Sequence, residues 1–177
     1  MGETTRLVGR SALVIGTAAI AQVGLFSQLP VAGVRVPVLL LVAVAAGLAL
    51  DPGRGAVIGF AAGLTFDLLL TTPMGLCAGV FAVTAYLVAR FAPPPREPVW
   101  WRLPVTAAVA SSLAYLGVVF AGWLLAQRPA APDHLVIVVL VVGAVNGALA
   151  PVAVRVLRWA GSDAPVDLAG VGPGRGR

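Results

Sequence analysis

The carboxyl group of Asp67 lies in an apolar stretch behind three glycines spaced four residues apart, Gly55, Gly59 and Gly63. Four residues advance a helix by about 400°, so the glycines and the carboxyl group form one stripe along a helix. Small residues at this spacing let another helix approach closely, and a carboxylate in an apolar span is costly unless it faces protein or water. The stripe therefore predicts a specific contact rather than a lipid-facing surface.

Two interpretations of Asp67 follow from its position. In the first, the carboxyl group accepts hydrogen bonds from a partner helix or from backbone, or stays protonated and donates one. In the second, it lies near the outer membrane interface, is hydrated, and helps to end the helix before the turn at residues 71–73. The glycines also allow two interpretations, because packing within the chain uses small residues as readily as a partner does. Internal packing is the favoured explanation for Gly55.

Two other segments repeat the small-residue pattern. Gly75 and Gly79 begin the next apolar segment, so the two helices of a hairpin could pack glycine against glycine. In the last apolar segment, Asn146 lies on one helical face with Gly143 and Gly147. The Asn146 amide would be buried within the membrane and would need a hydrogen-bond partner, more often one inside the bundle.

The sequence lacks the usual catalytic patterns. It has no Gly-x-Ser-x-Gly, no His-Glu-x-x-His and no phosphate-binding P-loop, and its one histidine, His134, lies in a loop. An intramembrane aspartyl protease needs two carboxylates close together, yet the acid nearest to Asp67 is Asp51, sixteen residues away. Cys77 is the single cysteine, so no intramolecular disulfide can form. We therefore expect no enzymatic activity, no cofactor and no metal site.

Composition indicates an integral membrane protein. Hydrophobic residues make up 59% of the chain and charged residues only 11%, whereas soluble domains are about a quarter charged. The 177 residues leave room for about six spans of roughly 20 residues and for little else. Twelve basic residues, all arginines, lie at the ends of apolar segments and form no basic run, which argues against nucleic-acid binding.

The pattern predicts an all-α, polytopic membrane protein, with a single transmembrane domain over residues 1–160 and a disordered cytoplasmic tail over residues 161–177. The second span is the least regular, because Arg35 and Pro37 leave only residues 38–50 uninterrupted, which suits a re-entrant or tilted segment as well as a full crossing. The expected spans are residues 11–29, 31–50, 55–70, 74–91, 103–126 and 135–159.

The arginines predict the orientation of this bundle. If the N-terminus is cytoplasmic, ten of the twelve arginines lie inside, and only Arg35 and Arg128 lie outside. This asymmetry is the positive-inside pattern of cytoplasmic loops. The tryptophans lie near the expected membrane boundaries, as interfacial aromatic residues do. We therefore expect a multi-pass protein of the bacterial cytoplasmic membrane, with both termini inside.

The chain resembles the bacterial rod shape-determining protein MreD family. The resemblance rests on two local motifs, Gly59-Phe60-x-x-Gly63-Leu64-x-x-Asp67 and Pro73-Met74-Gly75-Leu76-x-Ala78, and on the pattern of about six spans in fewer than 200 residues. Met74 stands where the family often has leucine. The candidate residues for partner binding or helix packing are Gly59, Phe60, Gly63, Leu64, Asp67, Pro73, Gly75, Gly79 and Asn146.

The resemblance implies a non-enzymatic membrane component of the cell-elongation machinery. Such a protein pairs with the bitopic protein MreC, associates with MreB, RodA and a class B penicillin-binding protein, and helps to direct lateral peptidoglycan synthesis. The family fold is similar to that of substrate-binding subunits of energy-coupling-factor transporters. The alternative function is therefore the substrate-binding subunit of a vitamin-type transporter, although the first span has no Ala-x-x-x-Ala pair. A small ion or proton carrier is disfavoured because only one acid is embedded.

Overall fold

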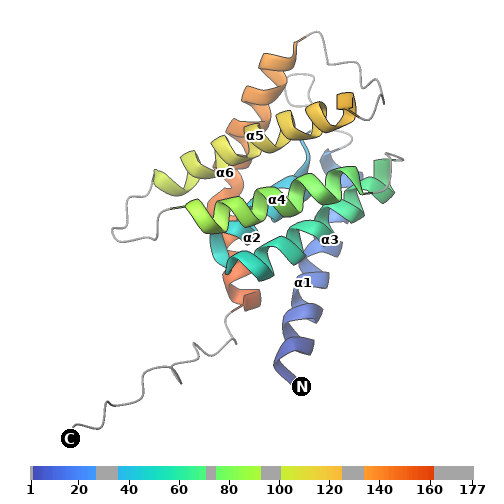
Figure 1. The fold of residues 1–177 in the computed structure, drawn as a ribbon. Coiled ribbons are helices and arrows are strands. Elements are labelled where there is room, and N and C mark those ends of the chain that lie inside the picture. The colour runs from blue at the N-terminus through green and yellow to red at the C-terminus, as the bar shows by residue number, and fades with distance from the viewer. Residues whose placement is uncertain (1, 27–35, 71–74, 93–100, 125–133, 162–177) are drawn as a thin grey trace, which may run out of the picture.

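The computed structural model describes residues 2–26, 36–70, 75–92, 101–124 and 134–161. These residues are almost entirely helical and form six α-helices and one short π-helical segment, η1 (Figure 1). The predicted tail after Gly161 and the predicted turn at residues 71–73 lie outside the described residues. In chain order the elements are α1 (Gly2–Ala21), η1 (Gln22–Phe26), α2 (Val38–Ala49), α3 (Pro52–Leu70), α4 (Leu76–Phe91), α5 (Arg102–Leu124) and α6 (Leu135–Gly161).

The largest differences from the expected spans lie in the first two helices. The first helix begins at Gly2, nine residues before the expected start of the first span. Hydropathy marks the apolar part of a helix, whereas its backbone hydrogen bonds can continue through polar residues. The second helix begins only at Val38, immediately after Pro37. This boundary matches the uninterrupted apolar stretch, because Pro37 cannot donate a backbone hydrogen bond within a helix.

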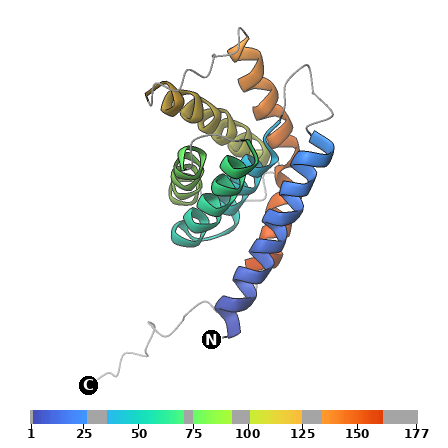
Figure 2. The same ribbon diagram turned by 90° about the vertical axis from the view of Figure 1, so that its right-hand side faces the viewer.

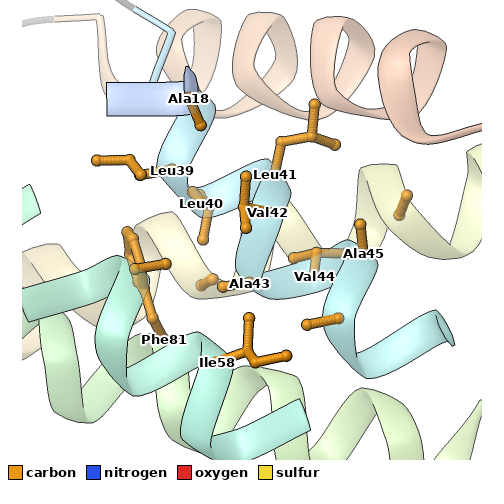
Figure 3. Packing of buried hydrophobic residues seen from close by; sticks show 14 of the residues in the cluster. Ala18, Leu39, Leu40, Leu41, Val42, Ala43, Val44, Ala45, Ile58 and Phe81 are labelled. Atoms are coloured by element: carbon orange, nitrogen blue, oxygen red, sulfur yellow. The ribbon is translucent and has the colours of Figure 1, made fainter. Parts of the chain in front are cut away.

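The second helix, α2, is the centre of the molecule. Nine of its twelve residues are buried, so it is enclosed by protein rather than apolar on one face only. Ile58 of α3 and Phe81 of α4 point toward it from one side, and Ala18 of α1 lies near its start (Figure 3). Twelve residues extend a helix by about 18 Å, less than the roughly 30 Å of a hydrocarbon core.

Around α2, the remaining helices form two groups. Helices α3 and α4 lie side by side as a hairpin, whereas α1 and α6 run together at a steep angle to them (Figures 1 and 2). The guanidinium of Arg10 in α1 donates a hydrogen bond to the Trp159 carbonyl in α6 at 3.3 Å and lies over the Trp159 ring. This contact places the first part of α1 beside the end of α6.

Two of the described helices, α5 and α6, are long and apolar enough to cross a membrane, while α2 and α4 are shorter apolar helices. Helices α5 and α6 pack closely. This is shown by Gly147 of α6, where an added Cβ would lie only 2.8 Å from the Pro104 carbonyl oxygen of α5. Many large apolar side chains remain exposed on the outer helices, among them Leu113, Phe120 and Leu140. An apolar outer surface is what a bilayer-embedded bundle requires.

Candidate functional site

The structure buries Asp67 and turns its carboxyl group toward the start of the next helix. Only 1% of the residue is exposed. Its Oδ2 accepts hydrogen bonds from the backbone N–H groups of Gly75, at 3.0 Å, and Ala78, at 3.2 Å. Its Oδ1 accepts one from the N–H of Cys77, at 3.2 Å. Of the two interpretations of Asp67, the hydrated helix end is therefore wrong, and the carboxyl group accepts hydrogen bonds from backbone.

The three donors belong to the first turn of α4, whose N–H groups have no partner within their own helix. Gly75 begins this turn with φ +101°, a left-handed conformation that glycine adopts at little cost. Gly75 has no side chain and so cannot cap the helix itself. Asp67 supplies that cap from the end of α3. In a membrane the cap matters more than in water, because no solvent is available to bond a free backbone donor.

The glycine stripe of α3 packs against neighbouring helices of the same chain, α4 and α2. A Cβ at Gly63 would lie 2.5 Å from the Cys77 carbonyl oxygen, and one at Gly59 would lie 2.7 Å from that of Phe81. Both positions exclude any side chain, because the atom that the added Cβ would meet first is a backbone carbonyl oxygen of α4. Gly55 instead meets α2, with its added Cβ 3.4 Å from the Ala46 carbonyl oxygen, an ordinary contact. The whole stripe is thus used for packing within the chain.

The expected packing of glycine against glycine across this hairpin is wrong. A Cβ added at Gly75 or Gly79 would meet nothing within 4 Å, and both residues are exposed. Helix α4 turns a different face toward α3, formed by Cys77, Ala78 and Phe81. Close approach requires small residues on one helix only, because the backbone of the other can rest directly on them.

A second face of α3, next to the glycine stripe, carries the other residues of the first motif. Phe60 is exposed and Leu64 is partly buried. They continue a stripe that begins at Val57 and ends at Leu68, both exposed. Steps of three and four residues keep these side chains on one helical face. The motif thus divides into residues that hold the hairpin and residues that face outward. Pro73 lies outside the described residues.

Asn146 of α6 is fully buried, as its position in the sequence predicts. Within the described part of the chain, neither Oδ1 nor Nδ2 of its amide has a hydrogen-bond partner. The hydroxyl of Ser111 in α5 is also buried without a hydrogen-bond partner among the described residues. The expected partner for Asn146 is therefore not found among the described residues of the bundle.

Two residues that hold helices in place are not among the predicted site residues. Gly47 of α2 contacts α4 as tightly as Gly63 does, since its added Cβ would lie 2.5 Å from the Ala85 carbonyl oxygen. Ala43 precedes Gly47 by four residues in the same helix, so the small-residue spacing was a signal that could have marked this contact. Gln22 caps the start of α2: its Oε1 accepts from the Val38 N–H at 2.6 Å. Gln22 is a polar residue in an apolar run, and this was the sequence signal that could have identified it as a cap.

These observations define a class: within the described residues, an all-helical apolar bundle in which α3 and α4 form a hairpin closed by a buried carboxyl cap. A family model of the rod shape-determining protein MreD matches residues 5–94, which contain both motifs and the hairpin. The chain belongs to the MreD family, and its role is in rod shape determination. Comparison with curated proteins and with solved structures found no match.

Proposed function

We propose that this chain is a non-enzymatic scaffold of the cell-elongation machinery in the bacterial cytoplasmic membrane. It binds an MreC-like bitopic protein and, together with MreB, RodA and a class B penicillin-binding protein, helps to direct lateral peptidoglycan synthesis. The family match supports this proposal, because the MreD family is part of the MreB, MreC and MreD shape-determining system.

The division of α3 into two faces is the observation that carries the partner proposal. Gly59, Gly63 and Asp67 are used by packing and capping within the chain. Phe60 and Leu64 belong to the same motif, yet the fold leaves Phe60 48% exposed. An exposed apolar stripe on a rigid helix can pack against a single transmembrane helix. The docking face proposed for the MreC-like partner is therefore Val57, Phe60, Leu64 and Leu68.

Co-purification from native membranes tests the docking face. We expect Phe60→Ala to reduce recovery of the MreC-like partner, because the ring is removed from the centre of the stripe. Phe120→Ala is the matched control, since Phe120 is also an exposed phenylalanine but lies on α5. Both variants must accumulate in the membrane at the level of the unsubstituted protein. Loss of the partner with Phe120→Ala and not with Phe60→Ala would move the docking face to α5.

The orientation is proposed with both termini and the segment of residues 93–100 in the cytoplasm. The arginine asymmetry supports it, and so does the contact between Arg10 and Trp159, which brings the first half of α1 beside the end of α6. Single cysteines can be labelled with an impermeant reagent after Cys77, the only native cysteine, is replaced. A cysteine beside Arg96 should be protected in intact cells and labelled in broken ones. Labelling in intact cells would reverse the orientation.

A substrate-binding subunit of a vitamin-type transporter is the second candidate. The observation that favours it is the buried Asn146 amide, which has no partner among the described residues and could bind a polar ligand. Saturable, high-affinity vitamin binding by the purified protein, without recovery of an MreC-like partner, would favour this candidate. Loss of that binding with Asn146→Leu would assign the site.

A further inference from the structure

A long apolar groove runs between α4 and α5 on the outer surface of the bundle. Its volume is about 860 Å³, and Leu87 and Phe91 of α4 and Val105 and Leu113 of α5 are among the residues that line it. The two helices run antiparallel along it, because Gly117 late in α5 meets Val80 early in α4. Figure 1 shows the two helices side by side.

The interior of the groove offers an occupant no free hydrogen-bond donor. Its two lining hydroxyl groups, those of Thr84 and Thr106, donate to carbonyl groups of their own helices at 2.7 and 2.8 Å. The remaining lining residues are apolar or glycine. An occupant of the groove must therefore be apolar along its length.

One end of the groove is strongly cationic. Arg90 lies one turn beyond the lining residue Leu87, and Arg102 lies one turn before the lining residue Val105. Both arginines are exposed. Helices α4 and α5 contain no acidic residue, so the helices that form the groove supply no counter-charge.

Two arginines elsewhere in the structure have acceptors within the chain. Arg10 donates to the Trp159 carbonyl, and Arg54 lies 3.4 Å from the Asp51 carboxylate. Within the described residues, the guanidinium groups of Arg90 and Arg102 have no such acceptor. Guanidinium groups bind phosphate oxygens through paired hydrogen bonds. An apolar groove with arginines at one mouth complements a molecule with apolar chains and an anionic phosphate head.

We propose that the groove between α4 and α5 binds an anionic phospholipid, with acyl chains along the groove and the phosphate at Arg90 and Arg102. Basic pockets between transmembrane helices on the cytoplasmic side are known to bind anionic head groups. This site is separate from the stripe on α3 proposed for the MreC-like partner. The lipid proposal can therefore fail while the scaffold proposal stands, and the reverse also holds.

Lipid retention by the purified protein tests this site. The protein is reconstituted with equal amounts of phosphatidylglycerol and phosphatidylethanolamine that carry the same acyl chains, and retained lipid is measured by native mass spectrometry. We expect one retained phosphatidylglycerol. Replacing Arg90 and Arg102 by glutamine should lower its retention about fivefold for each arginine, since each cation contributes about 1 kcal/mol near the head groups.

The paired control is Arg155→Gln with Arg158→Gln, which removes two exposed arginines from α6 and should leave retention unchanged. Gly79→Phe tests the groove itself, because Gly79 lines it and has open space around its added Cβ. It should lower retention of the lipid while the protein still elutes as a folded monodisperse species.

Three outcomes would overturn the proposal. Equal loss of lipid in the α6 double variant would show attraction to general surface charge. Unchanged retention with both Arg90 and Arg102 replaced would show that the arginines do not bind the head group. Crosslinking of a partner's transmembrane helix to Gly79→Cys, with no lipid retained, would show that a protein helix fills the groove.

Discussion

The starts of α3 and α4 are both capped by aspartate, but the two caps are built in opposite ways. Asp51 directly precedes its helix, is exposed, and accepts from the Arg54 N–H at 3.1 Å. Asp67 comes from the preceding helix, is buried, and accepts from three N–H groups of α4. The first cap stabilises one helix end, whereas the second also fixes the position of α4 on α3.

Asp67→Leu should produce the largest effect in this comparison. It removes the acceptors of three backbone donors, two of them buried with it, and each buried donor left unpaired costs about 1–3 kcal/mol. We expect a loss of at least about 2 kcal/mol of stability, measured by unfolding in detergent, and loss of rod shape in a complementation assay. Unchanged stability and wild-type shape at normal expression would refute the capping role.

Asp67→Asn sharpens this result. The single amide oxygen can replace Oδ2 and accept from Gly75 and Ala78, whereas the amide NH₂ group would face the N–H of Cys77. We therefore expect an intermediate loss of stability and partial complementation. A loss equal to that of Asp67→Leu would show that one amide oxygen cannot replace the carboxylate at the first turn of α4.

Gly63→Ala should cause the next largest loss of stability. Its Cβ would lie 2.5 Å from the Cys77 carbonyl oxygen, so the two helices must separate, and such overpacking costs about 1–3 kcal/mol. Gly79→Ala is the control, since its Cβ meets nothing within 4 Å and alanine favours helix by up to about 1 kcal/mol over glycine. Thermal unfolding of the two variants should shift in opposite directions. Equal shifts would contradict the close contact of α3 with α4.

Asp51→Ala should have the smallest effect. An exposed helix cap contributes about 1 kcal/mol, and the neighbouring Arg54 ion pair adds little because both side chains are exposed to solvent. We expect a small decrease in the unfolding midpoint and normal rod shape, with Asp51→Ser restoring most of the stability. Loss of shape with Asp51→Ala would show that this end of α3 has a role beyond capping.

The sequence by itself determined the features that depend on local pattern. Hydropathy indicated six helical segments, Pro37 marked the start of α2, and glycine spacing showed which face of α3 packs closely. Each of these signals lies within one helix or at one of its ends, where chain geometry fixes which residues are neighbours.

Only the tertiary structure decided which helix each face meets. It placed Asp67 on the first turn of α4, set α3 against Cys77 and Ala78 rather than Gly75 and Gly79, and made Gly47 a contact as close as Gly63. It also enclosed α2, although that helix has an apolar sequence like its neighbours. The physical reason is that spacing along one helix defines a face, whereas the partner of that face depends on the relative position and rotation of a second helix, which close packing of the whole bundle determines.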